Sequence, residues 1–215
     1  MQAEDAGQSA ERQRPDQVAW DYIDQRLDGV SARVDRITLA AHEAGHAVVG
    51  YYVGNRVPAD CEVWINARGK GEATLRGGTP WAKVVAALAG DAAVAVLIPD
   101  SSLFAGSIGE EELRTRADST IREHSRWQEQ GGESQAEDDE DIALALIVQT
   151  LPWAECAAVM AMFRDAEAEA LRIARIPAVR NAIETVMLAL LHHERLTGAD
   201  VERLIVSAGE GGRIQ

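Results

Sequence analysis

Cysteine is scarce in this 215-residue chain, which contains only Cys61 and Cys156. Two cysteines so far apart provide neither a disulfide framework nor a pair of adjacent zinc ligands. Hydrophobic residues make up 47% of the chain, which is enough to build a core without covalent staples. We therefore expect one compact domain in a reducing, cytoplasmic setting.

Long apolar runs and basic residues are also few. The most apolar stretch, residues 84–98, is shorter than the roughly 18 residues of a membrane span, and Asp91 interrupts it. The N-terminus is polar and lacks the pattern of a secretory signal. A formal net charge of -14 repels the phosphates of nucleic acids and anionic lipids. These absences predict a soluble protein with no membrane and no nucleic-acid partner.

The segments that are present form mostly helical patterns. We expect a disordered tail over 1–15, a single domain over 16–208 with a polar insertion near 107–137, and a flexible tail over 209–215. The insertion predicts an exposed helix plus a loop. Apolar spacing predicts a short strand pair within 61–76 and helices at about 15–27, 38–52, 79–98, 142–151, 153–175, 177–194 and 198–208. The predicted fold class is mainly α with a small antiparallel β-sheet.

Residues typical of helix ends support several of these boundaries. Thr79 before Pro80 is typical of a helix start, with an N-cap followed by proline at the first helical position. Thr197 with Asp200 resembles a capping box before the last helix. Gly54 tolerates the left-handed conformation that ends a helix, so we expect the 38–52 helix to stop there.

The most informative pattern is "AHEAGHAVVG" at 41–50, in a chain with only five histidines. Residues four apart lie on one helix face, so His42 and His46 can each direct a ring nitrogen at one metal ion. Glu43 points about 100° away and lies beside the open coordination position instead. There it can take a proton from a zinc-bound water, whose pKa falls to about 7. The spacing predicts two ligands and a general base.

Two other interpretations fit this helix pattern. Histidines placed there for packing alone would need hydrogen-bond partners of their own, and that interpretation stays open. Glu43 and His46 also have the Glu-x-x-His spacing of di-iron proteins, which require a second such pair. No other histidine has a glutamate three residues before it, so the di-iron interpretation fails.

Zinc catalysis needs a third protein ligand and an open fourth position. The remaining histidines are weak candidates, because His124 lies in the polar insertion and residues 192–193 lie near a helix end. The acidic cluster at 137–141 offers five carboxylates. A capping box of Ser134 with Glu137 and the positive end of a helix explain that cluster equally well. From the residues alone, the third ligand stays open.

Four segments together resemble the peptidase domain of the FtsH-type ATP-dependent zinc metalloproteases. "AAHEAGHAVVG" is close to that family's signature, and "ALAGDAAVAV", "DIALAL" and "LALLHHERLTGADVERLI" are similar to three further family segments, over about residues 36–206. The resemblance implies an FtsH-peptidase-like helical zincin domain over 16–208. It implies a Zn²⁺ site with His42 and His46 as ligands, Glu43 as catalytic base and Asp141 as third ligand.

The chain departs from this family in three places. Asp91, Val94 and Ala95 stand where the family has an arginine and paired glutamates. The insertion near 107–137 is much longer than the family's loop before the aspartate. The sequence contains no phosphate-binding loop of the Gly-x-x-x-x-Gly-Lys-Ser/Thr type, so we expect no ATP-driven unfolding engine here.

The expected function is that of a stand-alone soluble zinc metalloendopeptidase that cleaves unfolded or flexible polypeptide. The strand pair near 69–74 is similar to the family's edge strand, which could hold an extended peptide by strand addition. A separate ATPase and a second copy of the chain stay open as partners. The alternative is a non-catalytic zinc-binding or partner-interaction domain, and a metal hydrolase acting on another substrate class is not excluded.

Overall fold

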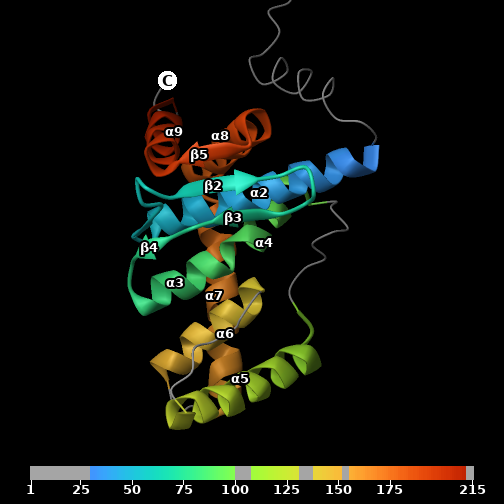
Figure 1. The fold of residues 1–215 in the computed structure, drawn as a ribbon, viewed down its shortest axis with the longest axis vertical. Helices are drawn as coiled ribbons and strands as arrows, with labels where there is room; N and C mark the ends of the chain where they lie inside the picture. The colour runs from blue at the N-terminus through green and yellow to red at the C-terminus, as the bar shows by residue number, and fades with distance from the viewer. Residues whose placement is uncertain (1–29, 100–107, 131–137, 152–154, 212–215) are drawn as a thin grey trace, which may run out of the picture.

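The computed structural model describes residues 30–99, 108–130, 138–151 and 155–211 of the chain. The tail over 1–15 and the helix expected at 15–27 lie outside these ranges. Within them, the mainly α fold with a small antiparallel sheet is confirmed (Figure 1). The elements are α2 (Val30–Tyr52), β1 (Asn55–Arg56), β2 (Glu62–Ile65), β3 (Gly71–Ala73), β4 (Arg76–Gly77), α3 (Pro80–Ala87), α4 (Ala89–Leu97), α5 (Glu110–Gln130), α6 (Asp139–Thr150), α7 (Cys156–Ala174), α8 (Pro177–His193), β5 (Arg195–Thr197) and α9 (Gly198–Gly211).

Helix α2 packs against α3, α4 and α8 and against β2 and β3; in Figure 1, α8 lies above it and α3 and α4 lie below it. It begins at Val30, earlier than the expected 38, and Gly54 follows it with a φ of 98°, as predicted. Small residues allow its neighbours to come close. A Cβ atom on Gly45 would lie 2.5 Å from the carbonyl oxygen of Ala89, so α2 and α4 can approach this closely only because residue 45 is glycine.

The expected strand pair, β2 and β3, is part of a three-stranded sheet of order β3-β2-β5, with β2 in the middle. Both pairings are antiparallel, with Val63 opposite Ala73 in β3 and Leu196 in β5. The sequence does not predict strand β5 or the separate β1-β4 pair, because an alternating pattern over two or three residues is too short to indicate a strand. Strand β3 is one of the two outer strands of this sheet, and it lies beside α2.

The prediction of a single helix over 79–98 is wrong, because the chain forms two helices, α3 and α4, with a bend of 44° between them. The break is at Leu88, whose φ of -91° and ψ of 4° leave the helical region. The predicted start is confirmed, since the Thr79 hydroxyl accepts the N–H of Ala82 at 3.1 Å. In the described ranges, no single helix is long and apolar enough to cross a membrane, and only this bent pair passes when its halves are joined.

The later helices extend the fold on two sides of α2: α8 packs directly against α2, whereas α5 and α6 pack through α3 and α7. Helix α5 fills most of the polar insertion and buries Leu113 and Ala117 against the core. Helix α7 packs against α3, α4, α5 and α6, and runs along the long axis in Figure 1. Reciprocal hydrogen bonds between Thr197 and Asp200 confirm the capping box before α9. Helix α9 continues to Gly211, so residues 209–211 of the expected tail are helical.

Candidate metal centre

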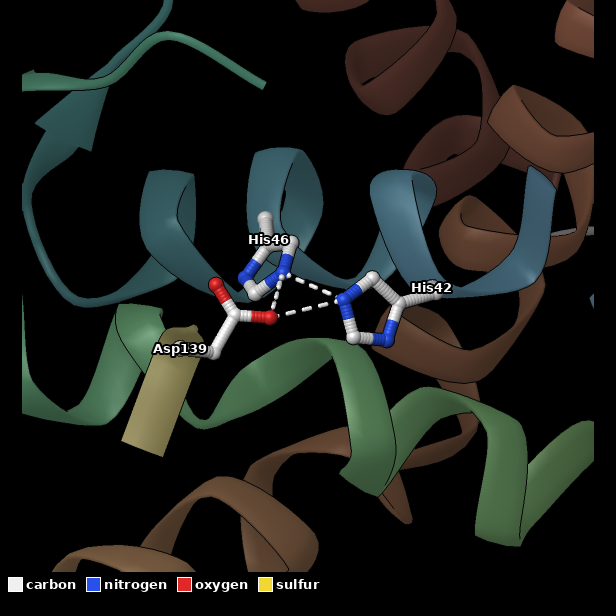
Figure 2. Close-up of side chains that lie close together, drawn as sticks. All are labelled: His42, His46 and Asp139. Atoms are coloured by element: carbon white, nitrogen blue, oxygen red, sulfur yellow. Dashed lines mark hydrogen bonds and ion pairs between the residues drawn. The ribbon is translucent and has the colours of Figure 1, made fainter. Parts of the chain in front are cut away.

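Three side chains converge between α2 and the start of α6 (Figure 2). The Nε2 atoms of His42 and His46 are 3.0 Å apart, and Asp139 Oδ2 lies 2.8 Å from the first and 3.1 Å from the second. Ligand atoms about 2.0–2.1 Å from a tetrahedral zinc ion are about 3.3 Å from one another. An outward shift of a few tenths of an ångström therefore makes room for an ion, and the three residues could hold a metal.

The outer ring nitrogens of both histidines face acceptors. His46 Nδ1 donates to the carbonyl oxygen of Ala86 at 2.8 Å, and since a carbonyl can only accept, the proton is on Nδ1. His42 Nδ1 lies 3.2 Å from Asp91 Oδ1, within ion-pairing distance. A proton on the outer nitrogen leaves the lone pair of Nε2 for a metal. The inner nitrogens are therefore oriented as ligands.

Without a metal, the site holds a proton between His42 and Asp139. Burial lowers the pKa of His42, but the carboxylates of Asp139 and Asp91 outweigh burial and raise that pKa to about 10. Burial raises the pKa of Asp139, yet the two histidines outweigh it and hold that pKa far below its usual range. A metal ion must displace this proton, so metal binding competes with protons here.

Asp141, which the family resemblance implies as third ligand, does not lie with the histidines. Its carboxylate instead lies 3.4 Å from Arg116 Nη1 on α5. Residues 139 and 141 are about 200° apart around a helix, so α6 can direct only one of them at α2. The structure brings Asp139 to the histidines, which corrects the expected position of the carboxylate by two residues.

Glu43 lies in the same cleft as the histidines and is only 5% exposed. Burial raises the pKa of its carboxyl group, although His46 and His42 partly oppose that effect. Strand β3 passes directly over this side chain, because a Cβ atom on Gly71 would come within 2.5 Å of Glu43 Oε1. A raised pKa makes the carboxylate a better proton acceptor near neutral pH.

The cleft around the candidate metal ligands has a volume of about 980 Å³. Its walls come from α2, β3, α3 and α6, so an outer strand of the sheet forms one side. Trp64, Leu75 and Ile142 provide apolar surface, while Lys70 and Lys83 add positive charge among several carboxylates. A cleft of this size can admit an extended chain segment.

Neither a protein-family model nor a curated protein matches this chain. The class of site is defined by its own geometry: two histidines and one carboxylate around a space for an ion, with a buried glutamate in the same cleft. Of the residues expected at the site, His42, Glu43 and His46 lie there together. Asp139 was one of the five candidate carboxylates at 137–141, but the family resemblance implied Asp141 as the third ligand, and no role was expected for Asp91.

Proposed function

We propose that this cleft is the active site of a zinc-dependent peptidase that cleaves unfolded or flexible polypeptide. The observation that carries the proposal is the convergence of His42 Nε2, His46 Nε2 and Asp139 Oδ2 in the cleft that also holds Glu43. Among the described residues the group offers three ligands, which leaves a fourth position open. Structural zinc sites instead use four protein ligands, so the count favours catalysis.

Each side chain has a distinct role in this proposal. His42, His46 and Asp139 hold the ion, which supplies Lewis acidity that polarises a carbonyl and acidifies a water. Glu43 accepts the proton of the attacking water and then passes it to the leaving amine. Its buried position and raised pKa suit both transfers, because the group must gain and lose a proton in one cycle.

Strand β3 suits the binding of the substrate backbone. It is an outer strand of the order β3-β2-β5, and its first residue lies against Glu43. An extended peptide that paired with β3 would run past the glutamate and the ligand group. Folded proteins cannot add a strand in this way, so we propose a flexible segment as substrate, delivered with or without a separate ATPase.

The test uses the full chain with one equivalent of zinc and unstructured casein as substrate. We expect the wild-type protein to cleave casein and Glu43→Gln to lose about 10²–10⁴-fold in rate, with zinc affinity retained. Glutamine keeps the size of the side chain and removes only the base. Equal rates in both proteins would overturn the role of Glu43. Tight zinc binding without cleavage of any peptide in a library would favour a non-catalytic zinc-binding domain.

A further inference from the structure

The outer nitrogen of His42 faces a carboxylate that the proposed chemistry does not use. This nitrogen points away from Asp139 in Figure 2, and it lies 3.2 Å from Asp91 Oδ1. Asp91 is the third residue of α4, on the far side of the break at Leu88. The family resemblance gave no role to an acid at this position.

The backbone of α4 holds the His42 ring where Asp91 can reach it. A Cβ atom on Gly90 would come 2.5 Å from His42 Nδ1 and 2.6 Å from Nε2, so the ring lies against bare backbone. Gly45 and Ala89 set the close approach of α2 and α4 one turn further along. The ring therefore has little freedom to turn, and the residue after Gly90 is placed beside its outer nitrogen.

We propose that Asp91 is a positioning residue for the metal centre: it fixes the tautomer and orientation of His42. This inference rests on the proposed metal site. A ligating histidine usually donates its second ring N–H to a carboxylate or carbonyl, which also makes the ligand more basic. The carbonyl of Ala86 accepts such a bond from His46. Asp91 Oδ1 lies 3.2 Å from His42 Nδ1, an ion-pair contact without hydrogen-bond geometry, so a small turn of the Asp91 side chain would complete the same bond for His42. The Asp91 side chain is 45% exposed, so it can adjust as the ion enters.

A simpler explanation for Asp91 is that an acid suits the first turn of a helix, where the backbone dipole is positive. This explanation and the positioning role predict different results. Asparagine and alanine both remove the charge from α4, so a dipole effect would change thermal stability equally in both variants. Only asparagine keeps an oxygen that can accept the N–H of His42. Zinc affinity therefore separates the two explanations, because positioning requires asparagine to retain affinity that alanine loses.

The experiment measures zinc affinity of the full chain by competition with a chromophoric chelator, and the visible spectrum of the cobalt(II) form. We expect Asp91→Ala to bind zinc about 10–100-fold more weakly, Asp91→Asn to retain most of the affinity, and the cobalt bands of the alanine variant to shift. Glu72→Gln removes one charge from strand β3, which lines the same cleft, and should change zinc affinity less than twofold.

Three results would contradict these expectations. Wild-type protein that does not bind zinc would overturn the proposed metal site itself. Wild-type protein that binds zinc while Asp91→Ala binds equally well would overturn the positioning role alone. An equal loss in Asp91→Ala, Asp91→Asn and Glu72→Gln would show that Asp91 acts only through its charge. Circular dichroism of the metal-free variants identifies any that fail to fold. If Asp91→Ala does not fold, the zinc affinity of Asp91→Asn is compared with that of Glu72→Gln instead.

Discussion

Asp139 Oδ2 lies 3.1 Å from His46 Nε2, although 93 residues separate the two in the chain. The contact joins the start of α6 to the middle of α2, and it exists only when both helices are packed in place. A metal held there binds the folded chain and not the unfolded one. Folding and metal binding are therefore coupled, and zinc at 100 times its Kd should stabilise the protein by about 2.7 kcal/mol.

Substitutions at residues 139 and 141 show which of the two aspartates is the third metal ligand. We expect Asp139→Ala to weaken zinc binding by more than the hundredfold that loss of an outer-shell partner causes, because it removes a direct ligand. Asp141→Asn should leave zinc affinity unchanged and cost less than about 1 kcal/mol of stability, since its ion pair with Arg116 is partly exposed. Isothermal titration with zinc measures both. The opposite order of effects would restore Asp141 as the third ligand.

The protonated His42–Asp139 pair predicts how stability of the metal-free protein depends on pH. The pKa of His42 is raised from 6.5 to about 10 in the folded state, so its contribution is complete below pH 6.5 and is lost as pH rises toward 10. Asp139 has a lowered pKa, so its contribution is lost only in acid, below its unfolded value of 3.8. We expect the melting temperature without metal to fall by several degrees between pH 6.5 and 9.5.

His42→Asn is the control for that titration. It should flatten the decrease between pH 6.5 and 9.5, because the group that loses its proton is gone. Zinc should have the opposite effect in the wild-type protein, since deprotonation of His42 favours the metal, and the stabilisation by zinc should grow over the same range. A decrease in melting temperature that is equally steep in the variant would assign it to other groups.

Gly71→Ala tests the contact between β3 and Glu43. The new Cβ atom would come within 2.5 Å of Glu43 Oε1, and the flexible carboxylate would have to move. We expect the rate of casein cleavage to fall by about 10–100-fold with zinc affinity preserved, because misplacing a catalytic group by about 1 Å costs that much. In a Glu43→Gln background the same substitution should have no further effect on the rate. Additive losses would show that residue 71 acts independently of Glu43.

Gly45→Ala tests the close packing of α2 against α4. Alanine usually stabilises a helix by about 1 kcal/mol relative to glycine, but here its Cβ would lie 2.5 Å from the Ala89 carbonyl oxygen, which is backbone and cannot move freely. We expect a net destabilisation of about 1–3 kcal/mol in urea unfolding. Gly209→Ala in α9 is the matched control, because its Cβ would meet nothing within 4 Å. That variant should be as stable as the wild type or more so.

Local chemistry made much of the fold predictable from the sequence. The N-cap at Thr79, the capping box of Thr197 with Asp200, and the left-handed Gly54 each act through neighbouring backbone groups, so a short window contains the whole cause. The same is true of His42, Glu43 and His46, whose spacing on one helix already determines which of them share a face. These features required no knowledge of tertiary contacts.

The features that were missed depend on partners far away in the chain. Strand β5 is stabilised by its pairing with β2, and at three residues Arg195–Thr197 is too short for its alternation to indicate a strand from the sequence alone. Asp139 is one of five consecutive acidic residues, and only the apolar residues that follow it on the same helix face distinguish it from the others. Residues four and eight positions after Asp139 lie on the same face of α6, and these are Ala143 and Ile147, both fully buried. Eight positions after Asp141 comes Gln149, which is exposed. The apolar row identifies the face of α6 that meets the core.

The break at Leu88 has a mechanical consequence for the two histidines. The carbonyl of Ala86, which accepts from His46, lies in the last turn of α3. Asp91, whose carboxylate lies 3.2 Å from His42 Nδ1, is in the first turn of α4. The bend of 44° thus places the end of α3 beside the His46 ring and the start of α4 beside the His42 ring, so the angle between the two helices contributes to how the imidazoles face each other. A change in that angle would retune the site without touching any residue that holds the ion.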